Sequence, residues 1–402
     1  MSDIRDYMKK RMKVLENTNE EVEEYEKRLK AHKSKKLIIA LVLLAIVVVC
    51  VVSYFLYQHF RTFETYKIIN TVEVEEAYNS TFASYNEGIV KYNADGIEYI
   101  VNGETKWQQA FEMKNPIIDI CQEYVAIAEY HSNKVYIFSG TGLEGEVETS
   151  YPIISLDVAS QGVVAMITEE EKINHIEVLD KKGTQIAMGQ TVLSGDGCPV
   201  DISISEDGTK LVVSYLYLSD GIMQSRVAFY NYGEVGKNEV DRLVGGFNHY
   251  ESTIIAKVEF INNDTAVAFG DDMITIYDVK EKPSLVKDIE VDKNISSIAY
   301  DSEYIAYIVE TGEADQAYEL FVYNTEAKLM TQKKFSFDCT AMQIAKDVVV
   351  LHNNTELMVY TVKGVNKFKG EIAEGINELL TSKEKYTYSI ISGEMMYDIQ
   401  LD

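Results

Sequence analysis

The sequence predicts an all-β domain, an eight-bladed β-propeller, preceded by a helical tail and one membrane-spanning helix. Three observations support this prediction. An uncharged apolar stretch lies near the N-terminus, a strand–turn–strand pattern recurs along the rest of the chain, and the last repeat lacks one strand. With 402 residues, 46% of them apolar, the chain is long and apolar enough to build one large β domain after a tail.

Residues 1–36 form a charged tail with a helical pattern. Apolar residues from Ile4 to Leu29 recur at helical spacing. The phrase TNEE, Thr18–Glu21, resembles a capping box, which starts a new helix. We therefore expect two short helices in a cytoplasmic tail. Their apolar seam allows homodimerisation through residues 1–33, and a solvated helix pair is the alternative.

Residues 37–57 predict a single membrane-spanning helix. The stretch LIIALVLLAIVVVCVVSYFLY contains no charged residue, and at about 1.5 Å per residue it spans roughly the 30 Å of bilayer hydrocarbon. Lysines crowd its N-terminal side, whereas only Arg61 closely follows its other end. The positive-inside rule places residues 1–36 in the cytoplasm and residues 58–402 outside the cell membrane. A cleaved signal peptide is disfavoured, because no small-residue cleavage site follows.

The rest of the chain repeats a pattern of short strands. A β-forming run ends in an apolar or aromatic residue and is followed by a polar residue and a turn. These end residues are Val101, Phe138, Leu179, Tyr230, Tyr277, Tyr323, Tyr360 and Tyr397. Their spacing of 37 to 51 residues is that of four-stranded propeller blades. From the second unit on, each begins with a hairpin such as ISISEDGTKLVVSY, Ile202–Tyr215, in which two strands flank an Asp-Gly turn.

The two ends of this region predict how the ring closes. Tyr397 lies on a third strand, and the few residues up to Asp402 leave no fourth strand for the last blade. The strand-like run Thr65–Val74 precedes the first full unit and has no blade of its own. We expect this run to serve as the outer strand of the last blade, so that no edge strand stays open. Seven blades is the alternative count.

These repeats resemble the WD-repeat and quinoprotein-like β-propeller superfamily, most clearly in SEDGTKLVVSY and ITIYDVK. With its single-pass anchor, the whole chain resembles an uncharacterised Gram-positive bacterial family, a domain of unknown function with a propeller ectodomain. Two features differ. Quinoproteins carry a Trp in nearly every blade, whereas Trp107 is alone here, and the Gly-His and Trp-Asp pairs of WD repeats are missing. The resemblance therefore implies the fold, without a quinone cofactor or a eukaryotic-style scaffold role.

Charge and motifs exclude several functions. Residues 37–402 carry 27 Lys/Arg against 56 Asp/Glu, a formal charge of −29, which disfavours binding to nucleic acids. GTGLEG, Gly140–Gly145, matches a dinucleotide-binding glycine motif, but no helix follows it, so we expect a turn between strands. The six histidines lack metal-ligand spacing, and no nucleophile elbow occurs. We expect no catalytic residue, no cofactor, no metal and no enzyme activity.

The longer repeats point to a partner surface. Their extra residues fall in four segments that we expect to be loops on one face of neighbouring blades: TEEEKINH (Thr168–His175), YLSDGIMQS (Tyr217–Ser225), GGFNHYEST (Gly245–Thr253) and ETGEADQAYE (Glu310–Glu319). Loops on a rigid scaffold often carry function. We expect His249 and Tyr250 to anchor a partner, because interfaces favour aromatic residues, and Asp220, Glu313 and Asp315 to form an acidic rim. Tolerated variation in length is the alternative.

These observations favour a membrane-anchored, extracytoplasmic binding or scaffold module of the bacterial cell envelope. It would recognise a protein or an envelope polymer through this face. Two alternatives stay open: a hydrolase-type enzyme with a site at the mouth of the central channel, and a structural envelope component that self-associates through its tail. Converging histidine and carboxylate side chains at the channel mouth would favour the enzyme.

Overall fold

The computed structural model describes residues 2–193 and 195–402. The chain divides into two compact units, Met1–Arg61 and Thr62–Asp402. Side chains in the helix of the first unit are described for residues 3–13, 18, 22, 27, 41–58 and 60.

The first unit is one continuous helix, α1, which runs from Ser2 to Phe60. The expectation of two short helices is therefore wrong. This stretch contains neither glycine nor proline. A helix that continues past Thr18 keeps the backbone hydrogen bonds that would be lost if it ended there and a new helix began. The segment Leu41–Gln58 has the length and composition of a membrane span, and none of it is buried. The side chains outside the described residues include those of the flanking lysines Lys30, Lys33, Lys35 and Lys36.

The second unit consists of eight antiparallel four-stranded sheets, which are the blades of a propeller. Blades 1 to 4 contain β2 (Thr81–Tyr85), β3 (Gly88–Tyr92), β4 (Gly96–Val101), β5 (Glu104–Ala110); β6 (Pro116–Cys121), β7 (Tyr124–Glu129), β8 (Lys134–Ser139), β9 (Gly142–Glu148); β10 (Ile153–Val158), β11 (Val164–Glu170), β12 (Ile173–Leu179), β13 (Gln185–Val192); and β14 (Cys198–Ile204), β15 (Lys210–Ser219), β16 (Ile222–Asn231), β17 (Leu243–Tyr250).

Blades 5 to 8 follow in chain order. They contain β18 (Ile255–Asn262), β19 (Thr265–Gly270), β20 (Met273–Asp278), β21 (Ser284–Glu290); β22 (Ile295–Tyr300), β23 (Tyr304–Glu310), β24 (Tyr318–Asn324), β25 (Leu329–Phe335); β26 (Ala341–Ala345), β27 (Val348–His352), β28 (Glu356–Thr361), β29 (Asn366–Glu371); and β30 (Glu378–Thr381), β31 (Thr387–Ser392), β32 (Met395–Leu401), with β1 (Tyr66–Glu73) as the fourth strand. Two short 3-10 turns complete the unit: η1 (Ala77–Asn79) and η2 (Val240–Arg242). The prediction of eight blades is confirmed.

The strands of each blade are called A to D from the propeller axis outward. The A strands are innermost, since those of adjacent blades contact one another, as β10 contacts β6 and β14. Because chain direction alternates within a blade, the A–B and C–D turns share one face, here called the AB face. The B–C turns and the connections between blades share the other, here called the BC face.

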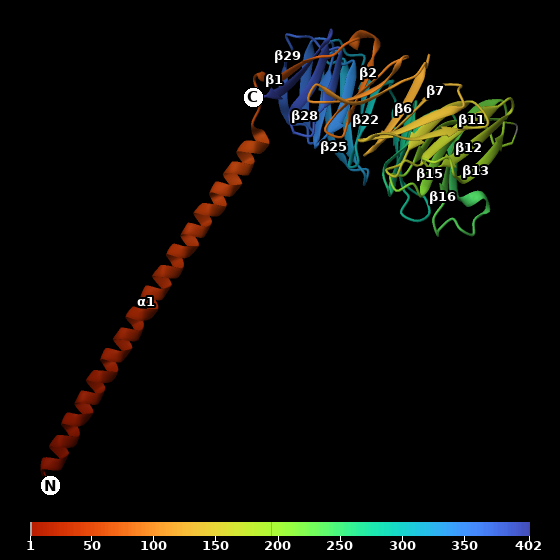
Figure 1. Ribbon diagram of the computed structural model, residues 1–402. Helices are drawn as coiled ribbons and strands as arrows, with labels where there is room; N and C mark the ends of the chain where they lie inside the picture. The colour runs from red at the N-terminus through yellow and green to blue at the C-terminus, as the bar shows by residue number, and fades with distance from the viewer. Residues whose placement is uncertain (1, 194) are drawn as a thin grey trace. The chain divides into compact units, whose positions relative to one another are not determined.

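The ring is closed by the first strand of the propeller. Strand β1 pairs antiparallel with β32 along its length, and Figure 1 shows β1 beside the blue C-terminal strands. Beyond the strand, the backbone N–H of Asp402 donates to the carbonyl oxygen of Thr65 at 2.9 Å. The prediction that Thr65–Val74 supplies the missing outer strand is confirmed. Both ends of the propeller thus hold each other, and blade 8 has all four of its strands.

The hydrophobic core lies between neighbouring blades. One cluster joins Ala126 and Val135 of blade 2 to Val164 and Met166 of blade 3. The middle strands are covered on both sides, so their side chains are apolar at consecutive positions. This explains the run from Val125 to Ala128 in β7, in which all residues are fully buried.

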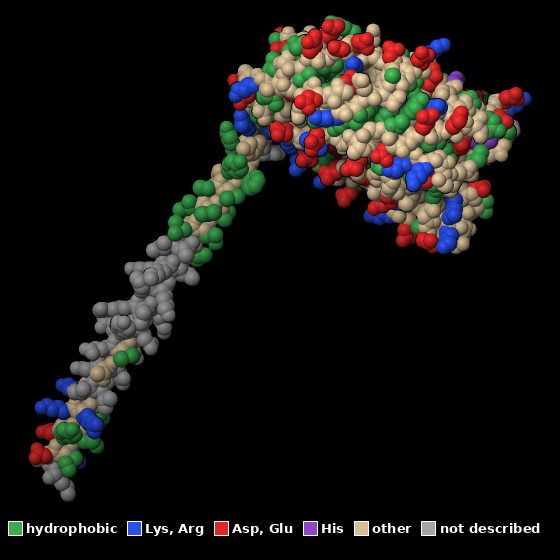
Figure 2. Space-filling view, viewed as in Figure 1, with side chains coloured by type: hydrophobic (Ala, Val, Ile, Leu, Met, Phe, Trp, Pro, Cys, Tyr) green, Lys and Arg blue, Asp and Glu red, His purple; other side chains and the backbone are tan. Residues whose placement is uncertain are grey.

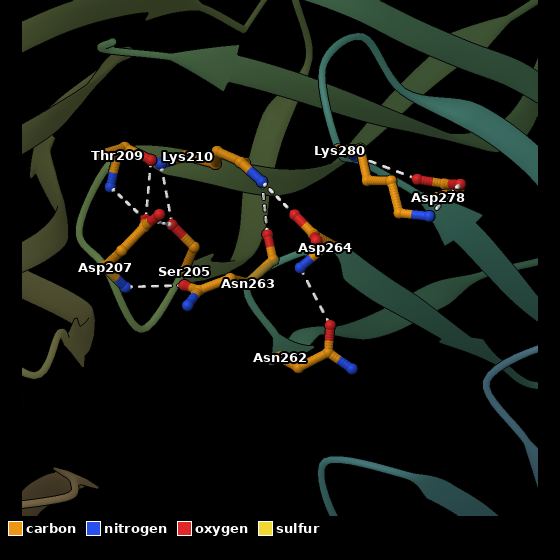
Figure 3. Close-up of polar contacts among 9 residues, drawn as sticks. All are labelled: Ser205, Asp207, Thr209, Lys210, Asn262, Asn263, Asp264, Asp278 and Lys280. Carbon is orange, nitrogen blue, oxygen red and sulfur yellow. Dashed lines mark hydrogen bonds and ion pairs between the residues drawn. The ribbon is translucent and has the colours of Figure 1, made fainter.

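Polar side chains on the AB face join blade 4 to blade 5 (Figure 3). The expected Asp-Gly turn is present between β14 and β15, where Gly208 has a φ of 70° and Asp207 Oδ1 accepts the hydroxyl proton of Thr209 at 2.7 Å. Lys210 is a buried residue, 7% exposed, and its ammonium group reaches the next blade. It donates to the carbonyl oxygen of Asn263 at 2.6 Å and pairs with Asp264 Oδ1 at 2.9 Å.

Candidate functional site

Three of the four segments expected to be loops are mostly strand. Thr168–His175 and Tyr217–Ser225 extend their B–C hairpins to two-residue turns, and β17 runs through most of Gly245–Thr253. Extra residues in a hairpin pair their backbone groups with each other, whereas a loop leaves those groups to water. The fourth segment, Glu310–Glu319, is mostly a loop, at residues 311–317. Sequence reasoning missed the connection 232–242 between β16 and β17, which lies on the AB face.

The extended hairpin of blade 4, Tyr217–Ser225, carries an exposed apolar tip. Its ladder continues to the pair Ser219 and Ile222, and the turn residues Asp220 and Gly221 both have positive φ, as in a type I′ turn. Three large apolar side chains beside this turn face solvent: Leu218 (69% exposed), Ile222 (55%) and Met223 (48%). Apolar side chains gathered on one exposed element are typical of interaction sites. The phrase YLSDGIMQS contained this signal, but sequence reasoning selected only its aspartate.

His249 and Tyr250 end strand β17 and have opposite environments. His249 lies on the BC face, where its Nε2 is 3.2 Å from Asp288 Oδ1 of blade 5. Tyr250 is fully buried, and its hydroxyl is hydrogen-bonded to that of Tyr277. Because side chains alternate along a strand, the ring of Tyr250 enters the core between blades 4 and 5. Tyr250 is therefore a core residue, and the expectation of an exposed anchor is corrected.

The three expected acidic residues are exposed but divided between two blades. Asp220 lies at the tip of the blade 4 hairpin, whereas Glu313 and Asp315 share the B–C loop of blade 6. Lys334 pairs with Glu313 at 2.7 Å, and this hydrogen bond lowers the pKa of Glu313. Blade 5 lies between the two positions, so the structure does not gather them into one rim.

A second group of carboxylates lies around the propeller axis. Each of three A-strand aspartates accepts a backbone N–H from the A strand of the next blade. The pairs are Asp119 with Val158 (2.8 Å), Asp157 with Ile204 (2.6 Å) and Asp201 with Val258 (2.9 Å). The A strands are the inner edges of their sheets, so these N–H groups have no strand to pair with. The signal was present in the sequence as the recurring phrases IIDI, SLDV and VDIS.

The next A strand adds Glu259 and one cation to this inner ring. Glu259 Oε2 lies 3.0 Å from Lys257 Nζ and accepts the hydroxyl proton of Tyr300 at 2.8 Å. Burial raises the pKa of Glu259, although Lys257 opposes the shift. Burial alone would lower the pKa of Lys257, but the neighbouring Glu259, Tyr300 and Asp201 raise it. These carboxylates thus bind backbone and side-chain donors of the fold. Among the side chains that the structure describes, no group of three or more histidine, cysteine and carboxylate residues could hold a metal ion.

Buried carboxylates predict that the propeller is more stable in mild acid. Burial raises the pKa of Glu378 to about 7, so the folded state holds this proton at pH values where the unfolded chain has lost it. Stability is then fully present below the ordinary carboxylate pKa and is lost as pH rises through about 7. We expect the full-length protein in neutral detergent to unfold at a higher temperature at about pH 5.5 than at about pH 8. Glu378→Gln should flatten this dependence, and an unfolding temperature that rises with pH in the unmodified protein would contradict it.

Comparison with solved structures supports the propeller fold. BamB from Moraxella catarrhalis has a TM-score of 0.51 and 11% identity, over 84% of this chain and 100% of BamB. Sqt1 from Saccharomyces cerevisiae has a TM-score of 0.55 and 11% identity, over 85% of this chain and 99% of Sqt1. Sqt1 from Chaetomium thermophilum, bound to the N-terminus of ribosomal protein L10, has a TM-score of 0.51 and 9% identity, over 85% of this chain and 96% of that Sqt1. At such identities the likeness concerns the fold alone.

Sequence comparison identifies the family. No curated protein sequence matches the chain significantly. A family model described as a family of unknown function, DUF5711, matches residues 59–401, which cover the whole propeller. The chain therefore belongs to the DUF5711 family.

Proposed function

We propose that the protein is a membrane-anchored, extracytoplasmic interaction scaffold of the bacterial cell envelope, and that it binds a partner protein at the BC face of blade 4. Residues 1–36 would lie in the cytoplasm, residues 37–57 in the cell membrane and residues 58–402 outside it. The apolar seam of the tail supports a homodimer through residues 1–33. The exposed apolar tip of the blade 4 hairpin is the observation that carries the proposal.

The tip is well suited to contribute binding energy. Leu218, Ile222 and Met223 are each about half exposed or more, so a partner that covers them removes apolar surface from water. At about 25 cal/mol per Å² this contributes roughly 1 kcal/mol or more for each side chain. The hairpin is held by a continuous antiparallel ladder down to blade 4, so little conformational entropy is lost when it docks.

Two further observations support a protein-binding role over catalysis. The ring of carboxylates around the axis serves backbone N–H groups, which leaves Asp119, Asp157 and Asp201 engaged in the fold. Sqt1, a propeller of similar fold, is bound to a segment of another protein. Figure 2 shows acidic side chains spread over the visible surface of the propeller, so the partner should not itself be strongly acidic.

Site-specific photo-crosslinking tests the proposal. A photoreactive amino acid is placed at Leu218 or Met223 of the full-length protein in its native membrane. Glu303, in the exposed A–B turn of blade 6 on the opposite face, is the matched control position. We expect a discrete protein adduct from the tip positions and none from Glu303, and Ile222→Asp should reduce adduct formation at Leu218 by at least about 10-fold. Equal crosslinking at both faces would overturn the assignment of the BC face.

A further inference from the structure

A cavity of about 640 Å³ lies between blades 3 and 4, and none of the tip residues Leu218, Ile222 and Met223 lines it. One wall is strand β13, the outer strand of blade 3, which has a hydrogen-bonded neighbour only on its β12 side. Ile186 and Met188 of this strand are each about half exposed. The opposite wall comes from β15, β16 and the end of the connection 232–242. A cavity of this size suits a small ligand or the end of a peptide.

Both arginines of the propeller line this cavity. Residues 62–402 include only two arginines, Arg226 and Arg242, and both line this cavity. The same residues include 24 lysines, and none of them lines it. The guanidinium group is planar and presents paired N–H donors, which match a carboxylate better than an ammonium does. The placement of these two side chains therefore points to an anion.

Arg226 lacks an anionic partner. Its Nη2 donates to the carbonyl oxygen of Asp196 at 2.5 Å, and its guanidinium lies 5.0 Å from the ring centroid of Tyr215. Its Nε is buried and has no hydrogen-bond partner. Across the part of the chain that the structure describes, neither Arg226 nor Arg242 forms an ion pair. The carbonyl and the ring offset the desolvation of this partly buried guanidinium only in part, because its charge has no carboxylate partner and its Nε–H has no acceptor.

The remaining lining narrows the chemistry of the anion. Asp196 and Asp241 also line the cavity, so its two arginines and two aspartates sum to no formal charge. A phosphate dianion would be repelled by both aspartates, whereas a carboxylate adds a single charge that Arg226 can balance. The other lining side chains include Ile186, Met188 and Tyr230, which can pack against an apolar or aromatic body.

We propose that this cavity binds a carboxylate carried on an apolar or aromatic body. Arg226 pairs with the carboxylate, and Ile186 and Met188 pack against the body. A free organic acid and the carboxyl end of a peptide share this chemistry. The proposal does not rest on the function proposed above, because the cavity and the hairpin tip are separate features and each can be tested alone.

Calorimetric titration of the full-length protein in neutral detergent tests the site. The probes are 4-phenylbutyrate, as a free acid, and acetyl-Gly-Gly-Phe with a free carboxyl end, each compared with its amide. We expect saturable binding of at least one acid. Its amide should bind about 10- to 100-fold more weakly, because it loses a charge-assisted hydrogen bond. The tighter of the two acids identifies the source. Binding of neither acid, equal binding of acid and amide, or tighter binding of phenyl phosphate would overturn the proposal.

Variants locate the binding within the cavity. Arg226→Met should lower the affinity for the acid by about 10- to 100-fold. Lys237→Met removes the same charge from an exposed side chain of blade 4 outside the cavity and should leave affinity unchanged. Met188→Glu keeps the fold, because Met188 is half exposed. The new carboxylate should repel that of the ligand and lower the affinity for the acid by about 10-fold. If both cavity variants bind like the unmodified protein, the site is not this cavity.

Discussion

Replacing the clasp strand β1, Tyr66–Glu73, by a Gly-Ser segment of equal length is expected to abolish cooperative folding of the propeller. The eight residues of β1 supply the whole fourth strand of blade 8. Their ladder with β32 and the partial burial of Val72 and Tyr66 add up to a loss on the order of 5–10 kcal/mol, if each backbone hydrogen bond contributes about 1 kcal/mol. Domains of this kind are stable by only about 5–15 kcal/mol in total.

Side-chain contacts of β1 add to this effect. The hydroxyl of Tyr66 donates to Glu374 Oε2 at 2.7 Å and accepts the backbone N–H of Ala373 at 2.9 Å. Val72 packs against the cluster that contains Met396 and Ile391 of blade 8 and Phe82 of blade 1. Without β1, the contacts that link the last blade to the first are reduced and β32 becomes an open edge.

The single tryptophan provides the measurement. Trp107 lies in blade 1 and stacks on Phe138 of blade 2, with ring centroids 4.8 Å apart. Its fluorescence therefore reports on the packing of the blades next to the clasp, without signal from helix α1. The control replaces the exposed loop 311–317 of blade 6 by a Gly-Ser segment of the same length as that loop and should unfold like the unmodified protein. A clasp variant with an unchanged unfolding transition would show that seven complete blades close without β1.

The blades and their closure were predictable because their signals are local in the sequence. Alternating apolar residues, Asp-Gly turns and a regular spacing each reflect the pairing of neighbouring strands, which needs no knowledge of distant contacts. The clasp followed from counting strands, since a run of β-formers at Thr65–Val74 and a missing last strand complete each other. The absence of glycine and proline from residues 2–60 is the sequence signal for the unbroken helix, and the capping-box motif at Thr18 does not interrupt it.

The site was less predictable because it depends on side-chain direction and on contacts between blades. Tyr250 differs from His249 by one position on β17, and that single step decides between the core and the surface. The dipeptide Asp220-Gly221 is itself a signal for a two-residue hairpin turn. The extended hairpin of blade 4 and its apolar tip could therefore have been predicted from the sequence. The sequence could not show that Arg226 and Arg242 line the same cavity, because this depends on how the connection 232–242 folds back beside β16.

Asp157→Val is expected to destabilise the propeller by about 2–4 kcal/mol, whereas Asp157→Asn should cost less than about 1 kcal/mol. Asp157 is 9% exposed, and its Oδ2 accepts the backbone N–H of Ile204 in the next blade at 2.6 Å. Valine has no acceptor, so this buried N–H loses its partner and its desolvation is no longer offset. Asparagine keeps an oxygen at the same place, and therefore preserves the bond between blades 3 and 4.

The comparison of the two variants separates hydrogen bonding from charge. Burial raises the pKa of Asp157 well above its usual value, with the neighbouring Asp119 carboxylate as the next cause, so folding favours the protonated form of this group. A neutral amide at position 157 resembles that protonated form, and its N–H₂ can donate to Asp119. Chemical unfolding of the full-length protein, followed by Trp107 fluorescence at about pH 7, measures both differences. Equal losses in the two variants would mean that the negative charge itself matters, and the inner ring would then be an ionic site instead of a set of hydrogen bonds between adjacent blades.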